Sequence, residues 1–109
     1  MKNAKTLDKK TYFKMTRGQD RTPLSTLKGE EFIPTAYCLY EYTNSDGQDV
    51  NGLSLLINGD VYITSSEPMI NSFDTILSVF GEDDDDVTLT IVSKTSKAGR
   101  EYNVLDVVI

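Results

Sequence analysis

The chain of 109 residues contains no histidine, no tryptophan and one cysteine, Cys38. Without histidine, a Ser–His–Asp triad, a Cys–His dyad and a Cys/His zinc site cannot be built within one chain. A lone cysteine forms no intrachain disulfide, so nothing argues for an oxidising compartment. The apolar runs are short, whereas a membrane helix needs ~20 apolar residues. The lysines near the N-terminus are not followed by the apolar segment that a signal peptide has. We therefore expect a cytoplasmic protein without a membrane segment.

Catalytic and cofactor-binding motifs are also missing. No glycine-rich phosphate loop occurs, and the paired carboxylates sit in turns rather than in apolar surroundings. The acidic run from Glu82 to Asp86 lacks the pattern of a calcium-binding EF-hand, and we interpret it as a solvated loop rather than a Mg²⁺ or Ca²⁺ site. We expect no enzymatic activity, no metal and no cofactor.

Positive charge is absent from a long central stretch. The formal net charge is −6, yet residues 29–93 hold thirteen acids and no Lys or Arg. Residues 1–28 hold eight basic residues against two acids, and Lys94, Lys97 and Arg100 lie near the other end. Such segregation predicts a basic stripe and an acidic back. The alternative is a loose basic tail on an ordinary acidic domain.

Apolar alternation and turn residues predict strands over most of the chain. We expect residues 1–11 to be loose and residues 11–15 and 24–29 to form short strands. Longer strands are predicted over residues 31–43, 50–57, 60–64, 87–94 and 101–109, with hairpin turns at Asp46-Gly47 and Asn58-Gly59. On this register Val61 and Ile63 point inward, and Tyr62 points outward.

One helix is expected between Ser65 or Ser66 and Gly81, with an apolar stripe over residues 69–80. Met69, Ile70, Phe73, Ile76, Leu77 and Phe80 recur with the helical period. Ser65 or Ser66 is placed to cap its start, Pro68 suits its first turn, and Gly81 is typical of its end.

The order strand, strand, strand, helix, strand, strand matches the OB-fold, a five-stranded Greek-key barrel. We therefore predict an all-β protein with one helix, a single domain with a barrel core over residues 30–109 and a basic N-terminal extension over residues 1–28. The alternative is an α+β fold in which the helix packs on an open antiparallel sheet.

Cations beside exposed aromatic rings are the groups that bind single-stranded nucleic acid without reading its sequence. The N-terminal segment and the last predicted hairpin both combine these groups, and Tyr62 lies between them on the predicted register. The candidate nucleic-acid-binding residues are Lys10, Tyr12, Lys14, Arg17, Arg21, Tyr62, Lys94, Lys97, Arg100 and Tyr102. A purely structural role is the alternative for three tyrosines, which would be barrel residues with a buried ring and a solvated hydroxyl: Tyr37, Tyr40 and Tyr62.

A resemblance to a known family covers residues 30–109. It is carried by three segments: YEYTNSDGQDVNGLSLLI, NGDVYITSSEPMINSFDTIL and KTSKAGREYNVLDVVI. They resemble small single-stranded DNA-binding proteins of bacterial phages and mobile elements. The resemblance implies an OB-fold that coats DNA during phage or plasmid replication in a host bacterial cytoplasm. It also implies possible homo-oligomers and replication proteins as partners. Many relatives recruit those proteins through an acidic tail, whereas the acidic run here lies at residues 82–86.

The leading hypothesis is sequence-independent binding of single-stranded DNA, with RNA as a close variant. The alternative is an acidic protein-interaction module, such as a phage- or plasmid-encoded inhibitor or adaptor that binds no nucleic acid. The stretch without Lys or Arg motivates it, because an acidic surface fits a basic partner.

Overall fold

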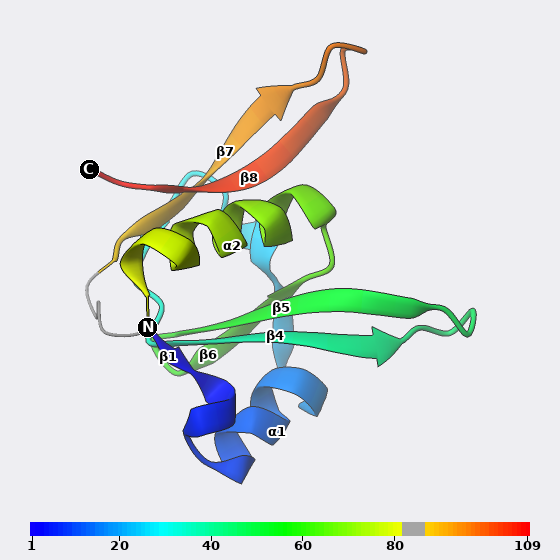
Figure 1. Ribbon diagram of the computed structural model, residues 1–109, viewed down its shortest axis with the longest axis vertical. Helices are drawn as coiled ribbons and strands as arrows, with labels where there is room; N and C mark the ends of the chain where they lie inside the picture. The colour runs from blue at the N-terminus through cyan, green and yellow to red at the C-terminus, as the bar shows by residue number, and fades with distance from the viewer. Residues whose placement is uncertain (82–86) are drawn as a thin grey trace.

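The computed structural model describes residues 1–81 and 87–109, which form a five-stranded sheet, a three-stranded sheet and two α-helices (Figure 1). The main sheet contains, in spatial order, β1 (Lys2–Asn3), β4 (Ala36–Thr43), β5 (Asp49–Ile57), β6 (Asp60–Thr64) and β2 (Arg21–Pro23). The small sheet contains β3 (Glu31–Phe32), β7 (Leu89–Thr95) and β8 (Glu101–Val107). The helices are α1 (Lys9–Arg17) and α2 (Glu67–Phe80), and 3₁₀ turns span Ala4–Thr6 and Leu24–Leu27.

The prediction of a mostly β protein with a helix before the last hairpin is confirmed, but the closed five-stranded barrel is wrong. Two sheet edges that a barrel would join are already occupied. The edge of β6 pairs in parallel with β2, with Arg21 opposite Val61. In β8, the backbone N–H of Leu105 donates to Ser72 Oγ of α2 at 2.9 Å. With β2 paired to β6 and α2 packed beside β8, these two strands do not pair with each other, and the two sheets stay separate.

The helix predicted between Ser65 or Ser66 and Gly81 is confirmed as α2. Pro68 lies in its first turn, and Gly81 ends it with a φ of 67°. Ser66 is its N-cap residue, but the prediction that a serine side chain caps the helix is wrong, because Ser66 makes no side-chain capping hydrogen bond. Phe73 is fully buried and its ring lies 5.4 Å from that of Tyr37 in β4, so the apolar face of α2 covers the main sheet. Within the described residues, no helix is long and apolar enough to cross a membrane.

The N-terminal segment is part of the fold, which corrects three predictions. Residues 11–15 belong to α1 rather than to a strand, residues 24–27 form a 3₁₀ turn, and residues 1–11 are not loose. Met1 and Ala4 are buried, and β1 pairs with β4. The missed signal is the N-cap of α1. The carboxylate of Asp8 accepts the Thr11 backbone N–H at 2.7 Å, which satisfies a free donor of the first turn.

The main sheet has apolar residues on both faces, and each face has its own cover. One face packs on α2 and the small sheet, through residues such as Leu53 and Leu55. The other packs on α1 and the preceding turn, where Met15, Ala4 and Val61 belong to one buried cluster. Figure 1 shows α1 on the opposite side of the main sheet from α2 and the β7–β8 hairpin.

Two-sided burial also reverses one predicted orientation. Tyr62 lies opposite Leu55 in the register of β5 and β6, and it packs against the larger core. The prediction that Tyr62 faces outward is therefore wrong. The sequence pattern assumed one buried face, and with two buried faces the inward and outward positions of β6 exchange.

The remaining strands follow their predictions with small shifts. The Asn58-Gly59 turn is confirmed, with φ of 52° and 83° at its two residues. The strand predicted over residues 31–43 is interrupted, because β3 ends at Phe32 and β4 begins at Ala36. Pro34 lies in this gap, and its missing N–H explains why it does not continue a ladder.

Candidate functional site

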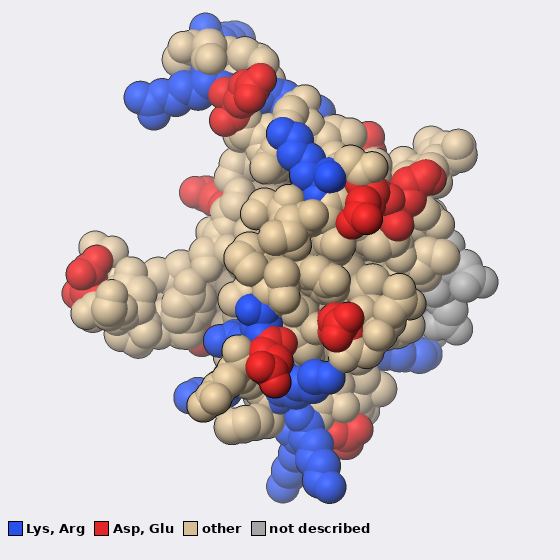
Figure 2. All heavy atoms as spheres, turned by 180° about the vertical axis from the view of Figure 1, so that it is seen from behind, with Lys and Arg blue, Asp and Glu red and all other residues tan. Residues whose placement is uncertain are grey.

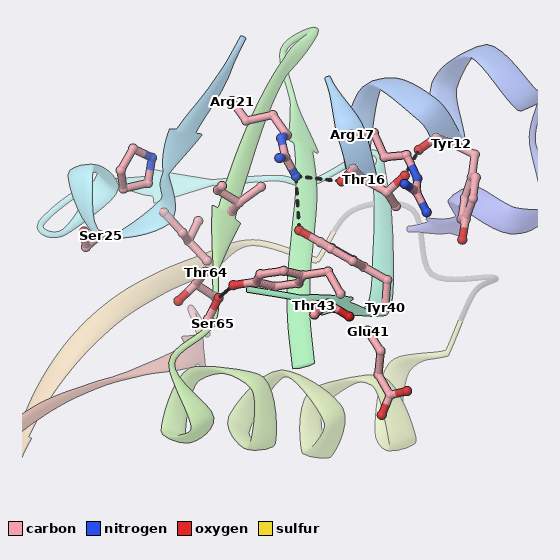
Figure 3. Close-up of a pocket in the computed structure, with 14 residues that line it drawn as sticks. Tyr12, Thr16, Arg17, Arg21, Ser25, Tyr40, Glu41, Thr43, Thr64 and Ser65 are labelled. Atoms are coloured by element: carbon pink, nitrogen blue, oxygen red, sulfur yellow. Dashed lines mark hydrogen bonds between the residues drawn. The ribbon is translucent and has the colours of Figure 1, made fainter. Parts of the chain in front are cut away.

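An open cleft of about 840 Å³ lies on the α1 side of the main sheet (Figure 3). Helix α1, strand β2, the end of β4 and the end of β6 line it. Its lining combines three tyrosine rings, two guanidinium groups and several hydroxyls: Tyr12, Arg17, Arg21, Tyr40, Tyr42, Thr43, Thr64 and Ser65. This mixture of flat rings and cations is suited to a planar ligand that carries negative charge.

The floor of the cleft is formed by the rings of Tyr40 and Tyr42. Both project from β4 on the same face, and their ring centroids are 5.8 Å apart. The ring of Tyr40 extends over Gly52 of the neighbouring strand, where a Cβ atom would approach the ring to 2.8 Å. The hydroxyl of Tyr42 is hydrogen-bonded to Ser65 Oγ, just beyond β6. Both side chains therefore cross β5. Each is attached to β4 at one end, and its hydroxyl is hydrogen-bonded at the other end.

Arg21 joins this floor to α1. Its Nε donates to the Gly18 carbonyl at 2.8 Å, and its Nη1 donates to the Thr16 carbonyl at 2.9 Å and to the Tyr40 hydroxyl at 3.2 Å. The carbonyls at the end of a helix lack partners within the helix. Arg21 donates hydrogen bonds to these carbonyls, and its positive charge complements the negative end of the helix dipole. Arg21 is therefore first a structural residue, which positions both Tyr40 and α1.

Ser54 supports the same end of α1 from below. This side chain is fully buried in β5, and its hydroxyl donates to the Met15 carbonyl. Together with Arg21, it satisfies carbonyls of the last helical turn with partners from the sheet. The position of α1 over the cleft is thus determined by contacts that are distant in the sequence.

Arg17 differs from Arg21 because its side chain makes no hydrogen bond or ion pair with any residue that the structure describes. It is exposed at the last turn of α1 and lines the cleft. Glu41, the single acid in the lining, points away from the tyrosine rings in Figure 3. The guanidinium of Arg17 is accordingly available to an anionic ligand.

The other predicted residues of the N-terminal segment have different positions. Tyr12 lines the cleft and packs against the smaller core. Lys14 donates from Nζ to the Gly59 carbonyl at 2.8 Å, at the start of β6 rather than at its cleft-lining end. Lys10 is exposed on the first turn of α1, outside the cleft lining. Of the predicted set, the cleft brings together Tyr12, Arg17 and Arg21.

The predicted residues of the last hairpin lie elsewhere. Lys94 and Tyr102 face each other across β7 and β8, and Lys97 and Arg100 are exposed in the connecting turn. Because the main sheet and α2 separate this hairpin from α1, the expectation of one continuous basic stripe is wrong (Figure 1). The physical reason is that α1 occupies the face of the main sheet opposite to the small sheet.

Sequence reasoning missed Tyr42 and its role beside Tyr40. A signal was present, because Tyr40 and Tyr42 alternate in a strand and therefore share one face. The companion signal is Gly52 in the partner strand, since an interior glycine of a strand often marks a close approach. Only the register of β4 with β5 places the two features opposite each other.

Two pKa shifts mark structural positions outside the cleft. Hydrogen bonds from the backbone and side chain of Thr11 lower the pKa of the exposed Asp8 carboxyl. Burial raises the pKa of the Cys38 thiol, which keeps it protonated and poorly reactive. No cluster of three metal-ligating side chains occurs in residues 1–81 and 87–109, and the run from Glu82 to Asp86 lies outside the described residues.

Comparison with known proteins finds no matching family model, no matching curated protein and no matching solved structure. The resemblance to phage single-stranded DNA-binding proteins therefore stays a prediction.

Proposed function

We propose that the protein binds single-stranded DNA without sequence preference, and that the cleft beneath α1 is its binding site. The single observation that carries the proposal is the row of Tyr40 and Tyr42 rings with the unpartnered Arg17 beside it. Bases stack on flat aromatic side chains whatever their identity, at ~1–3 kcal/mol per base, and a cation beside them neutralises the backbone.

The different roles of Arg21 and Arg17 support this proposal. Arg21 is occupied by two backbone carbonyls and the Tyr40 hydroxyl, so it holds the Tyr40 ring in position. Arg17 is the cation that meets a phosphate. A role in coating DNA during phage or plasmid replication extends this proposal and rests on the resemblance of residues 30–109.

The test is fluorescence anisotropy with a labelled oligo-dT of about 20 nucleotides, a length beyond the ~4–16 nucleotides that single small domains cover. We expect binding at low salt, with log K falling by ~0.7 per neutralised phosphate as log salt rises. Tyr42→Leu and Arg17→Ala should each weaken binding, whereas Tyr42→Phe should retain most of it because the ring remains. An RNA oligomer of matched sequence measures the preference between the two nucleic acids.

Tyr102→Leu, in the β7–β8 hairpin, is the matched control for Tyr42→Leu. It removes a tyrosine ring of similar exposure, 36% against 38%, outside the cleft. Absence of oligonucleotide binding at low salt contradicts the proposed function. Equal weakening by Tyr42→Leu and Tyr102→Leu contradicts the assignment of the site to the cleft.

A protein-interaction module is the second candidate function, and the protruding β4–β5 hairpin favours it. This hairpin carries Asp46 and Asp49 at its end without a neighbouring cation in the sequence. A pull-down after nuclease treatment separates the candidates. One stoichiometric protein partner, with no nucleic acid and no oligonucleotide binding in solution, supports this second function.

A further inference from the structure

Two β-hairpins project from the body of the protein on the same side, and they carry opposite charge (Figures 1 and 2). We call the end of the β4–β5 hairpin, residues 41–49, the acidic arm; its charged residues are Glu41, Asp46 and Asp49. We call the end of the β7–β8 hairpin, residues 94–101, the basic arm; its charged residues are Lys94, Lys97, Arg100 and Glu101. In Figure 2 the two ends are red and predominantly blue, respectively.

Both arms are ordered by hydrogen bonds within their own turns. In the acidic arm, Asn44 Oδ1 accepts the backbone N–H groups of Asp46 and Gln48, each at 3.0 Å. In the basic arm, the Ser96 N–H donates to the Arg100 carbonyl at 2.8 Å, and Ser96 Oγ accepts the Arg100 N–H at 3.2 Å. Ordered arms lose little conformational freedom on binding, so their charges are presented at low entropic cost.

The charges of the arms are not neutralised within the molecule. The charged side chains at 46, 94, 97 and 100 make no ion pair with any residue in the described ranges. Asp49 accepts one hydrogen bond, from Thr43 Oγ1 of its own arm. Each arm therefore presents an exposed charge that fits a partner of the opposite sign.

We propose that the two arms are the interface of a homodimer, in which the basic arm of each copy contacts the acidic arm of the other. Because both arms project from one side, a two-fold rotation makes both contacts at once and leaves neither arm free. A surface that is complementary to itself in this way closes as a dimer rather than growing into a filament. Two contacts made together also strengthen each other beyond what one exposed ion pair supplies.

Sedimentation velocity of the full chain at two salt concentrations tests the dimer. We expect dimers at about 50 mM salt and monomers at about 500 mM, because the Debye length falls several-fold in this range. A monomer at every protein concentration and at both salt concentrations overturns the proposal. A dimer that is indifferent to salt also overturns it, since an interface of exposed charges must weaken when screened.

Charge reversal identifies the surfaces. Lys97→Glu with Arg100→Glu and, separately, Asp46→Lys with Asp49→Lys should each weaken dimerisation by about tenfold or more, because each places like charges together. Combining all four substitutions restores opposite charges across the interface, and dimerisation should return to within about threefold of the original. Failure of the combined variant to recover overturns the pairing of the arms.

The control for net charge is Asp74→Lys with Glu30→Lys, which changes the charge of the chain as much as the acidic-arm variant does. Both residues are exposed and lie outside the arms. Equal weakening by this control means that overall charge, rather than the arms, governs association. Arg17→Ala should leave dimerisation unchanged, so a failure of the proposed DNA binding is distinguishable from a failure of the dimer.

A polyanion is the competing occupant of the basic arm. The same variants are therefore titrated with the labelled oligo-dT. Loss of oligonucleotide binding in Lys97→Glu with Arg100→Glu, in a protein that stays monomeric at low salt, overturns the dimer and assigns the basic arm to nucleic acid.

Discussion

The ring of Tyr40 lies directly over Gly52, its partner across β4 and β5. A Cβ atom at position 52 would stand 2.8 Å from Tyr40 Cζ, closer than any normal contact. The glycine thus allows the ring to cross the neighbouring strand and reach Arg21, which donates to its hydroxyl at 3.2 Å. The floor of the cleft depends on this absence of a side chain.

Gly52→Ala should displace the Tyr40 ring and destabilise the protein by about 1–3 kcal/mol, a cost typical of overpacking. Urea unfolding measures the change. In a Tyr40→Ala background the clash is gone, and the same substitution should be neutral or slightly stabilising, because alanine restricts the unfolded chain more than glycine does. Equal destabilisation in both backgrounds would contradict the close approach.

Substitution of Arg21 should lower the stability of the protein, whereas substitution of Arg17 should lower its affinity for the oligonucleotide. Arg21→Ala removes two hydrogen bonds to the end of α1 and one to the Tyr40 hydroxyl, and we expect a loss of about 1.5–3 kcal/mol in the free energy of unfolding, within the range for charged donors. Arg17→Ala should change stability by less than about 0.5 kcal/mol, as is usual for exposed positions. In the anisotropy titration, Arg17→Ala should nevertheless weaken oligonucleotide binding. A reversed pattern of stability effects would refute the roles assigned here.

Ser54→Ala should destabilise the protein by about 1–3 kcal/mol, because it leaves the Met15 carbonyl without its buried donor. Amide hydrogen exchange across α1 provides the specific measurement. Faster exchange in residues 9–17, with β7 and β8 unchanged, is expected. Ser45→Ala, at an exposed position of the β4–β5 turn, is the control and should have no effect on α1.

Asp8 should make α1 sensitive to acid. Its folded pKa lies below the ordinary value of 3.8 because the ionised carboxylate accepts hydrogen bonds from Thr11. The resulting stability is fully present above the unfolded pKa and is lost as the pH falls through the lowered folded pKa. Asp8→Asn retains a capping oxygen but does not titrate.

The difference in unfolding free energy between the original protein and Asp8→Asn should therefore shrink between pH 6 and pH 3, with the original protein losing its advantage. Urea unfolding at a series of pH values measures it. A constant difference over this range would show that the cap acts without its charge.

Some elements were predictable because their signals are local. Helix α2 combines an apolar stripe with a proline at its start and Gly81 at its end, all within one segment of sequence. The Asn58-Gly59 turn is equally local, since positive φ at both residues is intrinsic to that pair. These predictions needed no knowledge of what the elements pack against.

Helix α1 was missed for the opposite reason. Nine residues are marginal for a helix in isolation, and tertiary packing supplies most of the stability of such short helices. Its last carbonyls are satisfied by Ser54 and Arg21, which belong to strands of the main sheet. Nothing within residues 9–17 predicts those partners, although Asp8 and Thr11 do indicate the N-cap.

The sequence by itself determined the strand-rich composition, the amphipathic helix α2 and the separation of basic from acidic segments, because each follows from the identity and spacing of neighbouring residues. Only the tertiary structure decided that α1 covers the second face of the main sheet. That placement separates the N-terminal cations from the β7–β8 hairpin and sets Arg17 beside the rings of Tyr40 and Tyr42. The physical reason is that a sheet with two apolar faces must bury both, and the choice of cover for each face depends on contacts between distant segments.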